Sequence, residues 1–248
     1  AFKFTAGPIR VTKVDAARLA EENELEPKSP IEVKGLGSKL TDFNRIERVS
    51  EPAGLKAELR SYQSDGYYWM QFLSQHELNG ILADDMGLGK TLQTLTHLLT
   101  EKEAQRNAGL PSLVIAPTSV VVNWQREADK FTPDLCVLIL QGADRNQRYA
   151  QIPRADLVLT SFALIHRDLE VFLGHRFHLV ILDEAQHIKN PTAKVTQAVC
   201  QLDSKHRLCL SGTPIENNLG ELWSLMHFLM PGLLGTQENF NDTFRNPI

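Results

Sequence analysis

The chain of 248 residues lacks several features that mark special classes of protein. It has only three cysteines, Cys136, Cys200 and Cys209, and their spacing fits neither a disulfide framework nor a zinc site. The eight histidines are scattered, without the i, i+4 pairs that hold a metal on a helix. No stretch approaches the roughly 18 apolar residues of a membrane-spanning helix, and no signal peptide is recognisable. We therefore expect no disulfide scaffold, no structural zinc and no membrane partner.

An excess of basic residues is also missing. Lysine and arginine number 26 against 30 aspartates and glutamates, which gives a net charge of −4. A protein that attracts nucleic acid through a global positive field has the opposite balance, so any nucleic-acid contact here must be local. The length and the hydrophobic content of 42% are ordinary for one sizeable globular core. Because the chain starts without methionine and ends at Asn246-Pro247-Ile248, we expect a piece of a longer protein.

The pattern of residues changes near residue 55. Residues 1–55 show little periodicity and contain Pro-Lys-Ser-Pro at 27–30, so we expect a linker or peripheral segment there. In residues 56–248, short apolar runs alternate with segments of helical spacing, which predicts an α/β fold with a mostly parallel sheet and helices on both faces. Strands are expected around 81–83, 113–116, 135–140, 157–159, 178–182 and 207–210, and a helix from an N-cap at Ser119 to about Phe131.

A phosphate-binding loop follows the first of these apolar runs. The octet from Asp84 to Thr91 ends in Gly-Lys-Thr, which is typical of a loop between a strand and a helix. Its glycines let backbone N–H groups approach phosphate oxygens, its lysine supplies positive charge, and its threonine supplies a hydroxyl for Mg²⁺. The octet departs from the full motif at Asp84, where the motif has glycine. The loop residues expected to bind a nucleotide are Asp85, Met86, Gly87, Leu88, Gly89, Lys90 and Thr91.

A pair of carboxylates, Asp183 and Glu184, ends the apolar run at 177–182. A phosphate loop and an acidic pair at the end of a strand are the two halves of a site that hydrolyses a nucleoside triphosphate. We expect Asp183 to hold Mg²⁺ together with Thr91, and Glu184 to orient or deprotonate the attacking water. The alternative is that the two acids only cap the next helix. The presence of the phosphate loop makes this alternative much less favoured.

The order of the motifs resembles that of the first lobe of the Swi/Snf family of DNA-translocating ATPases, within helicase superfamily two. In that family an acidic or small residue commonly replaces the first glycine of the phosphate loop, as Asp84 does here. The resemblance covers about residues 55–248 and implies a RecA-like P-loop NTPase lobe. The similar segments are the glutamine motif at 59–66, the phosphate loop at 84–91, Ala-Pro-Thr-Ser and Asn-Trp within 115–124, Leu-Thr-Ser-Phe at 159–162, the acidic box at 183–190, and Ser-Gly-Thr-Pro-Ile-Glu-Asn with Glu-Leu-Trp within 210–223.

The resemblance also implies roles for single residues, with ATP and Mg²⁺ as cofactors. The amide of Gln63 is expected to read the adenine base, because it can both donate and accept. Trp69, Trp124 and Trp223 are expected to pack in the core rather than to stack on bases. The residues carried over are Arg60 and Gln63 for nucleotide binding, Lys90, Asp183 and Glu184 for catalysis, Thr118, Thr160 and Ser161 for contacts to the DNA backbone, and Ser211 and Thr213 for coupling the nucleotide to DNA.

The function implied by the resemblance is that of a DNA-dependent ATPase, which moves along duplex DNA and remodels protein–DNA complexes whose protein component is unidentified. The sequence contains no Gln-x-x-Gly-Arg segment of the kind by which the family's second lobe completes the ATP site. We therefore expect a second RecA-like lobe as partner, with the isolated chain nearly inactive and only weakly bound to DNA. The alternatives are an RNA helicase, a restriction-enzyme motor, a non-hydrolysing scaffold or a small-molecule kinase. The lead-in looks bacterial, so we expect a cytoplasmic, nucleoid-associated protein, or a nuclear one if the source is eukaryotic.

Overall fold

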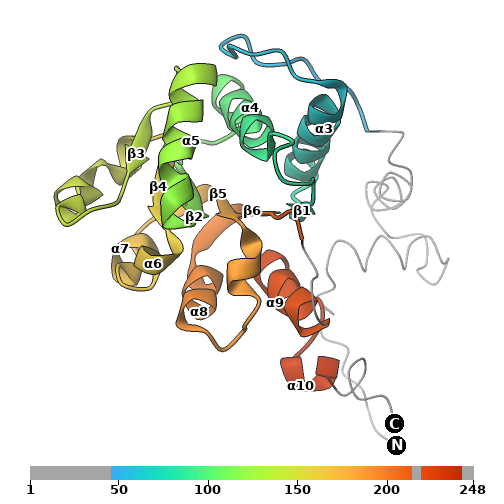
Figure 1. Ribbon diagram of the computed structural model, residues 1–248, viewed down its shortest axis with the longest axis vertical. Helices are drawn as coiled ribbons and strands as arrows, with labels where there is room; N and C mark the ends of the chain where they lie inside the picture. The colour runs from blue at the N-terminus through green and yellow to red at the C-terminus, as the bar shows by residue number, and fades with distance from the viewer. Residues whose placement is uncertain (1–45, 214–218, 242–248) are drawn as a thin grey trace, which may run out of the picture. The chain divides into compact units, whose positions relative to one another are not determined.

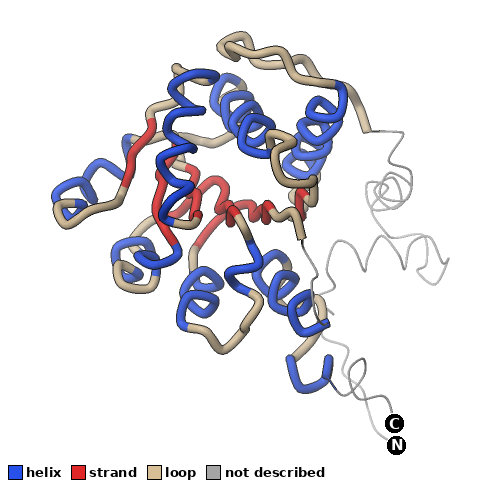
Figure 2. The backbone as a smooth tube through the Cα atoms, viewed as in Figure 1, coloured by secondary structure: helices blue, strands red, loops and turns tan. Residues whose placement is uncertain are grey.

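A six-stranded parallel sheet runs through the middle of the structure (Figure 1, Figure 2). Its strands lie in the order β1-β6-β5-β2-β4-β3, and every pairing between neighbours is parallel. All six strands expected from the apolar runs are confirmed. They are β1 (Gly80–Leu82), β2 (Ser112–Ala116), β3 (Val137–Ile139), β4 (Leu157–Ser161), β5 (Arg176–Asp183) and β6 (Asp203–Leu210).

Helices cover both faces of this sheet, as the α/β pattern predicts (Figure 1). On one face lie α3 (Ser61–Gln75), α4 (Lys90–Glu103) and α5 (Thr118–Phe131). The other face carries α6 (Phe162–Ile165), α7 (Leu169–Leu173), α8 (Lys194–Gln201) and α9 (Leu219–Leu229). The remaining helical segments are α10 (Gln237–Phe240) and the 3₁₀ helices η2 (Arg145–Arg154) and η3 (Ala185–Ile188). The three-layer RecA-like arrangement is confirmed.

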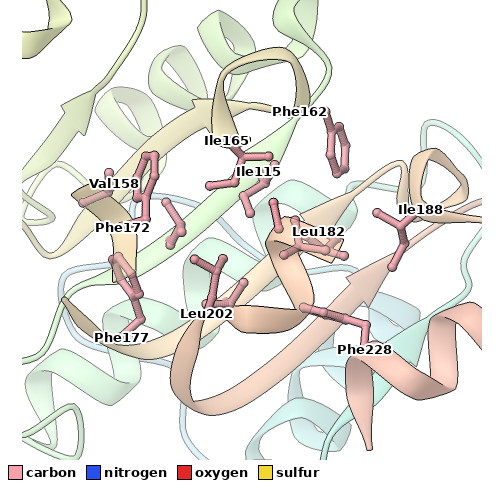
Figure 3. Packing of buried hydrophobic residues seen from close by; sticks show 14 of the residues in the cluster. Ile115, Val158, Phe162, Ile165, Phe172, Phe177, Leu182, Ile188, Leu202 and Phe228 are labelled. Carbon is pink, nitrogen blue, oxygen red and sulfur yellow. The ribbon is translucent and has the colours of Figure 1, made fainter. Parts of the chain in front are cut away.

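Two apolar clusters hold the layers together, one on each face of the sheet. Successive side chains of a strand point to opposite faces, so Val180 and Leu182 belong to one cluster while Leu179 and Ile181 belong to the other. Burial on both faces explains why β5 is an unbroken apolar run. Figure 3 shows part of the cluster beneath the later helices, with labelled side chains from strands and helices: Ile115, Val158, Phe162, Ile165, Phe172, Phe177, Leu182, Ile188, Leu202 and Phe228.

The computed structural model describes residues 46–213 and 219–241, and from Val49 onward these residues belong to one compact unit. The predicted linker of residues 1–55 lies mostly outside the described residues, and its boundary stays a prediction. Within the described part, the chain just before α3 is fixed to the helices, because the Glu103 carboxylate accepts the N–H groups of Ala53 and Gly54 at 2.9 and 2.8 Å. Of the helices in these ranges, none has the length and hydropathy needed to cross a bilayer.

The start of α5 corrects one prediction. The helix begins at Thr118, with Pro117 as its N-cap and no side-chain cap, so the expected cap at Ser119 is wrong. The proline ring fixes φ, at −55° here, and this favours the start of a helix even without a capping hydroxyl. The carbonyl of Pro117 accepts the N–H groups of Val120 and Val121. The predicted end at Phe131 is confirmed.

The strand order positions the site. Because β6 lies between β1 and β5, the loops that follow these three strands leave the same carboxyl edge next to one another. Leu210 at the end of β6 pairs with Leu82 on one side and with Asp183 on the other. Two interstrand spacings, about 10 Å, therefore separate the strand that precedes the phosphate loop from the acidic pair.

Candidate nucleotide-binding site

The phosphate loop between β1 and α4 depends on two glycines in left-handed backbone conformations. Gly87 has φ of +83° and Gly89 has φ of +80°, a region that L side chains rarely occupy. Gly89 is also crowded, because a Cβ atom there would lie 2.4 Å from Nε2 of Gln63. Gly89 is the N-cap of α4, so the loop leads directly into a helix N-terminus, where backbone N–H groups and the helix dipole favour a phosphate.

Lys90 and Asp84 brace this loop from inside. The Lys90 ammonium donates to the carbonyl oxygens of Asp84 at 2.6 Å and Asp85 at 3.1 Å. The Asp84 carboxylate accepts a hydrogen bond from Nε2 of Gln93 at 2.9 Å, and Gln93 is fully buried in α4. The residue that departs from the full phosphate-loop motif is thus tied to the helix that follows. Met86 is exposed at the loop, and its Cγ lies 3.3 Å from the position of a Cβ on Gly212.

Gln63 connects the glutamine motif to the phosphate loop. Its Oε1 accepts the N–H of Arg60 at 3.0 Å, and its Nε2 donates to the carbonyl of Leu88 at 3.0 Å. An amide has a second lone pair and a second N–H, so these bonds leave capacity to meet the edge of an adenine. Arg60 itself is exposed. The nucleotide role expected for Gln63 stays a prediction, and the sequence did not predict its hydrogen bond to the loop.

The carboxylate of Asp183 is buried at the end of β5 and held at both oxygens. Its Oδ2 accepts the indole N–H of Trp124 at 2.8 Å, and its Oδ1 accepts the N–H of Glu184 at 3.0 Å. Burial raises the pKa of Asp183, and the neighbouring charge of Glu184 adds to the rise, whereas the bond from Trp124 and the charge of Lys90 oppose it. A cation beside this carboxylate would favour its ionised form.

Glu184 stands in a strained backbone conformation. Its φ of 54° and ψ of 56° lie in the left-handed region, which costs a residue other than glycine on the order of 1–3 kcal/mol. Such strain is concentrated at functional sites in proteins. The side chain is half-buried, and its Oε2 accepts a hydrogen bond from Nε2 of Gln186 at 2.7 Å.

A chain of hydrogen bonds leads from Glu184 to the loop after β6. Besides donating to Glu184, Gln186 accepts the Ser211 hydroxyl at its Oε1, over 3.1 Å. The Ser211 oxygen in turn accepts the N–H of Thr213 at 3.1 Å. The two residues predicted to couple are therefore linked to the acidic pair through Gln186, which the sequence did not single out. The rest of that predicted motif, residues 214–217, lies outside the described residues.

The three residues predicted to contact DNA have different surroundings. Thr118 is exposed at the start of α5. Ser161 is buried at the end of β4, and its hydroxyl has no hydrogen-bond partner in the described ranges. Thr160 is fully buried, and its hydroxyl donates to the carbonyl of Leu140 at 3.2 Å. The DNA role of Thr160 stays a prediction; in this structure its side chain faces into the protein and its hydroxyl bonds to the backbone that follows β3.

A second link joins the region after β4 to the acidic box. The ring of His187 stacks on Phe162, with ring centroids 4.8 Å apart and planes 6° from parallel. Phe162 directly follows Ser161 and begins α6. The loop predicted to meet DNA and the loop that carries Glu184 are thus in direct contact.

The available ligands suit Mg²⁺. Thr91 is half-buried in the first turn of α4, so a hydroxyl oxygen and the Asp183 carboxylate are the donors near the phosphate loop. Mg²⁺ prefers such hard oxygen ligands and usually keeps water and phosphate oxygens as the others. Consistent with that, the described part of the chain contains no group of three or more histidines, cysteines, aspartates or glutamates that could hold a metal by itself.

Comparison with known proteins shows the family. The model of the SNF2-related domain matches residues 62–248. TATA-binding protein-associated factor mot1 of Aspergillus fumigatus is 44% identical over 223 residues, 85% of this chain and 12% of that protein. The human TATA-binding protein-associated factor 172 is 41% identical over 223 residues, with 84% and 12% covered. The chain thus spans about an eighth of the length of these relatives.

A solved structure agrees with the sequence comparisons. The Sulfolobus solfataricus SWI2/SNF2 ATPase core in complex with dsDNA superposes with a TM-score of 0.75 and 42% identity, over 81% of this chain and 42% of that chain. The fold of this chain is therefore shared with that ATPase core. The chain belongs to the SNF2-related domain family, the ATPase core of Swi2/Snf2 proteins in helicase superfamily two.

Proposed function

We propose that the chain is the first, ATP- and Mg²⁺-binding lobe of a DNA-dependent ATPase that moves along duplex DNA. The observation that carries this proposal is the position of the phosphate loop and of Asp183-Glu184 on either side of β6, at one edge of the sheet. A triphosphate on the loop would extend toward the acidic pair. A protein that only binds a nucleotide does not need an acidic pair beside the phosphate loop.

Each residue of the site has its own role in ATP hydrolysis. Lys90 exchanges its bonds to two loop carbonyls for the β- and γ-phosphates, and thereby neutralises charge as the phosphoryl group leaves. Thr91 and Asp183 hold Mg²⁺, which when bound neutralises charge on the phosphate oxygens. Glu184, fixed by Gln186, orients the attacking water and accepts its proton. Gln63 and Arg60 meet the base, and the loop from Asp85 to Gly89 wraps the phosphates.

Two features support duplex DNA as the partner. The similar Sulfolobus core was solved with dsDNA. Thr118 follows β2 and Ser161 ends β4, at the same edge as the ATP site. Hydroxyl and backbone N–H groups suit phosphate contacts, which position a strand without reading its sequence. The stack of His187 on Phe162, the hydrogen bond that Ser211 donates to Gln186, and the bond that Gln186 donates to Glu184 would connect these contacts with Glu184. With a net charge of −4, the chain alone would bind DNA weakly.

The second lobe is part of the proposal. The Sulfolobus core is more than twice as long as its matched part, because this chain covers 42% of it, and this sequence contains no Gln-x-x-Gly-Arg segment. An arginine supplied to a phosphoryl-transfer site accelerates it by about 10³–10⁵. The isolated chain should therefore bind ATP and hardly hydrolyse it. A bacterial origin stays a prediction, since the relatives above come from Aspergillus, human and Sulfolobus.

The test uses the full-length parent protein. Glu184→Gln keeps the size of the side chain and removes the base, so we expect DNA-stimulated ATP hydrolysis to fall by about 10²–10⁴ while ATP binding persists. Glu170→Gln, at an exposed glutamate of α7, is the matched control and should hydrolyse ATP like the wild type. Stimulation by single-stranded RNA but not by duplex DNA would favour the RNA-helicase alternative. Unchanged turnover of Glu184→Gln would refute the assignment.

A further inference from the structure

The indole of Trp124 has a polar partner that core packing alone does not require. We propose that Trp124 is a positioning residue for the Mg²⁺ site, which fixes the Asp183 carboxylate and ties it to helix α5. The proposal rests on the proposed function, because it assigns Asp183 to the metal. It goes beyond that function by adding a residue that touches neither nucleotide nor metal.

The first support is the pair of hydrogen bonds on the carboxylate. Trp124 donates to Oδ2 over 2.8 Å and the N–H of Glu184 donates to Oδ1 over 3.0 Å, so each oxygen has its own fixed donor. Donors on both oxygens oppose rotation of the carboxylate about its last bond. Each oxygen accepts more than one bond, so both keep capacity toward a metal or its water. Partners of this kind orient metal ligands in many sites, and their loss typically weakens metal binding by 10- to 100-fold.

The second support is the rigidity of the donor. Trp124 is fully buried, and Val121 and Ala128 lie buried on the same face of α5, at helical spacing of three and four residues. This face packs on β2, which is the neighbour of β5, and on β4, which lies on the far side of β2. The indole therefore cannot follow Asp183 if the carboxylate turns. The hydrogen bond from Trp124 therefore fixes the Asp183 carboxylate relative to α5.

The third support is the position of the helix that carries the donor. Because α5 begins at exposed Thr118, a DNA contact that shifts the helix would also shift the donor to Asp183.

The decisive comparison is Trp124→Phe against Trp223→Phe. Both variants of the 248-residue chain replace a buried indole by a ring without a donor, but Trp223 stacks on His227 and makes no bond to Asp183. ADP affinity is measured by calorimetry over a Mg²⁺ series. We expect Trp124→Phe to need about 10- to 100-fold more Mg²⁺ for the same gain in ADP affinity. Trp223→Phe should stay within about twofold of the wild type.

A result in which Trp124→Phe also stays within about twofold overturns the inference and leaves the proposed function intact. If the wild type shows no effect of Mg²⁺ on ADP affinity, the proposed function fails as well. If Trp124→Phe does not fold, the double variant Trp69→Phe/Trp223→Phe leaves Trp124 as the single tryptophan of the chain. Its emission should change on addition of Mg²⁺ and ADP, and this change should disappear with Asp183→Asn. Constant emission during Mg²⁺-dependent ADP binding also overturns the inference.

Discussion

Two groups of polar side chains occupy opposite ends of the same strands, and they are built differently. At the carboxyl ends of β5 and β6 lie Asp183, Glu184 and Ser211, beside the phosphate loop. Toward the amino end, beneath α3 and α4, lies a network that we define as Gln71, His97, Glu101, Arg106 and His178, all buried except Arg106, whose side chain is 38% exposed. The first group leaves bonding capacity for ligands, whereas most polar atoms of the second group bond to one another, and we call this group the closed network.

The closed network is centred on Glu101, which is 1% exposed. Its carboxylate accepts Nη2 of Arg106 at 2.6 Å and the Ser74 hydroxyl at 3.1 Å, and lies 3.1 Å from Nε2 of His178. Burial acts to raise the pKa of Glu101, but the bond from His178 and the bond and positive charge of Arg106 hold that pKa well below its usual range. These bonds offset the loss of hydration of the Glu101 carboxylate, so the network serves stability, although Nδ1 of His178 has no hydrogen-bond partner among the described residues.

The largest effect is expected from opening the closed network. Glu101→Gln removes the carboxylate that contacts Arg106 and His178. Breaking a buried charge pair costs about 3–5 kcal/mol, and the partial exposure of Arg106 places the expected loss toward about 3 kcal/mol. Urea titration of the chain should show this loss in the free energy of unfolding. Asp203→Asn breaks an ion pair with Arg176 that is 3.7 Å long and mostly exposed, and should change stability little. Equal effects of the two variants would contradict the comparison.

A substitution at the carboxyl edge should lower the rate of ATP hydrolysis and leave the free energy of unfolding nearly unchanged. Lys90→Ala deletes two hydrogen bonds to loop carbonyls and the charge that meets the phosphates. Loss of such a preorganised contact lowers turnover by about 10²–10³, or roughly 3–4 kcal/mol. We expect this in ATP hydrolysis by the full-length protein, with a midpoint of urea unfolding near that of the wild type. A large fall in both quantities would mean that the loop also carries the fold.

Lowering the pH should destabilise the closed network through His97. Burial lowers the pKa of His97 to about 4, from 6.5 in the unfolded chain, so the unfolded state binds more protons between these values. The stability of the neutral ring is present above pH 6.5 and is lost as the pH falls to about 4, by up to roughly 3 kcal/mol. His97→Gln keeps a partner for Gln71 and does not titrate, so unfolding measured across this range should depend less on pH. An unchanged slope would exclude His97 as its source.

The smallest effect is expected at the link between the acidic pair and the loop after β6. Ser211→Ala removes one hydrogen bond to Gln186, worth about 0.5–1.5 kcal/mol. In the full-length protein we expect the stimulation of ATP hydrolysis by duplex DNA to fall by about two- to tenfold. The basal rate should change less than the stimulated rate. A matching fall in both rates would show that Ser211 supports the chemistry rather than the coupling.

Much of this molecule was predictable from local pattern. The six strands followed from continuous apolar runs, because a strand buried on both faces must be apolar throughout. The phosphate loop and the acidic pair followed from residue types that few other sites combine. The cap at Ser119 failed, because a proline can start a helix without a hydroxyl, and a sequence offers both solutions. The sequence did not show that the Thr160 side chain points into the protein, because this depends on how β3 and β4 pack.

The sequence by itself determined the elements, their parallel arrangement and the residue types of the phosphate loop and acidic pair, since these depend on local apolar patterns and local chemistry. Only the tertiary structure decided which distant residues share hydrogen bonds. Trp124 and Asp183 are 59 residues apart, and Gln63 and Leu88 are 25 apart, yet each pair shares a hydrogen bond. Such bonds depend on strand order and helix packing, which bring distant segments together. A local sequence pattern does not predict these bonds, because the neighbours of a residue in the chain do not specify its partner in a distant segment.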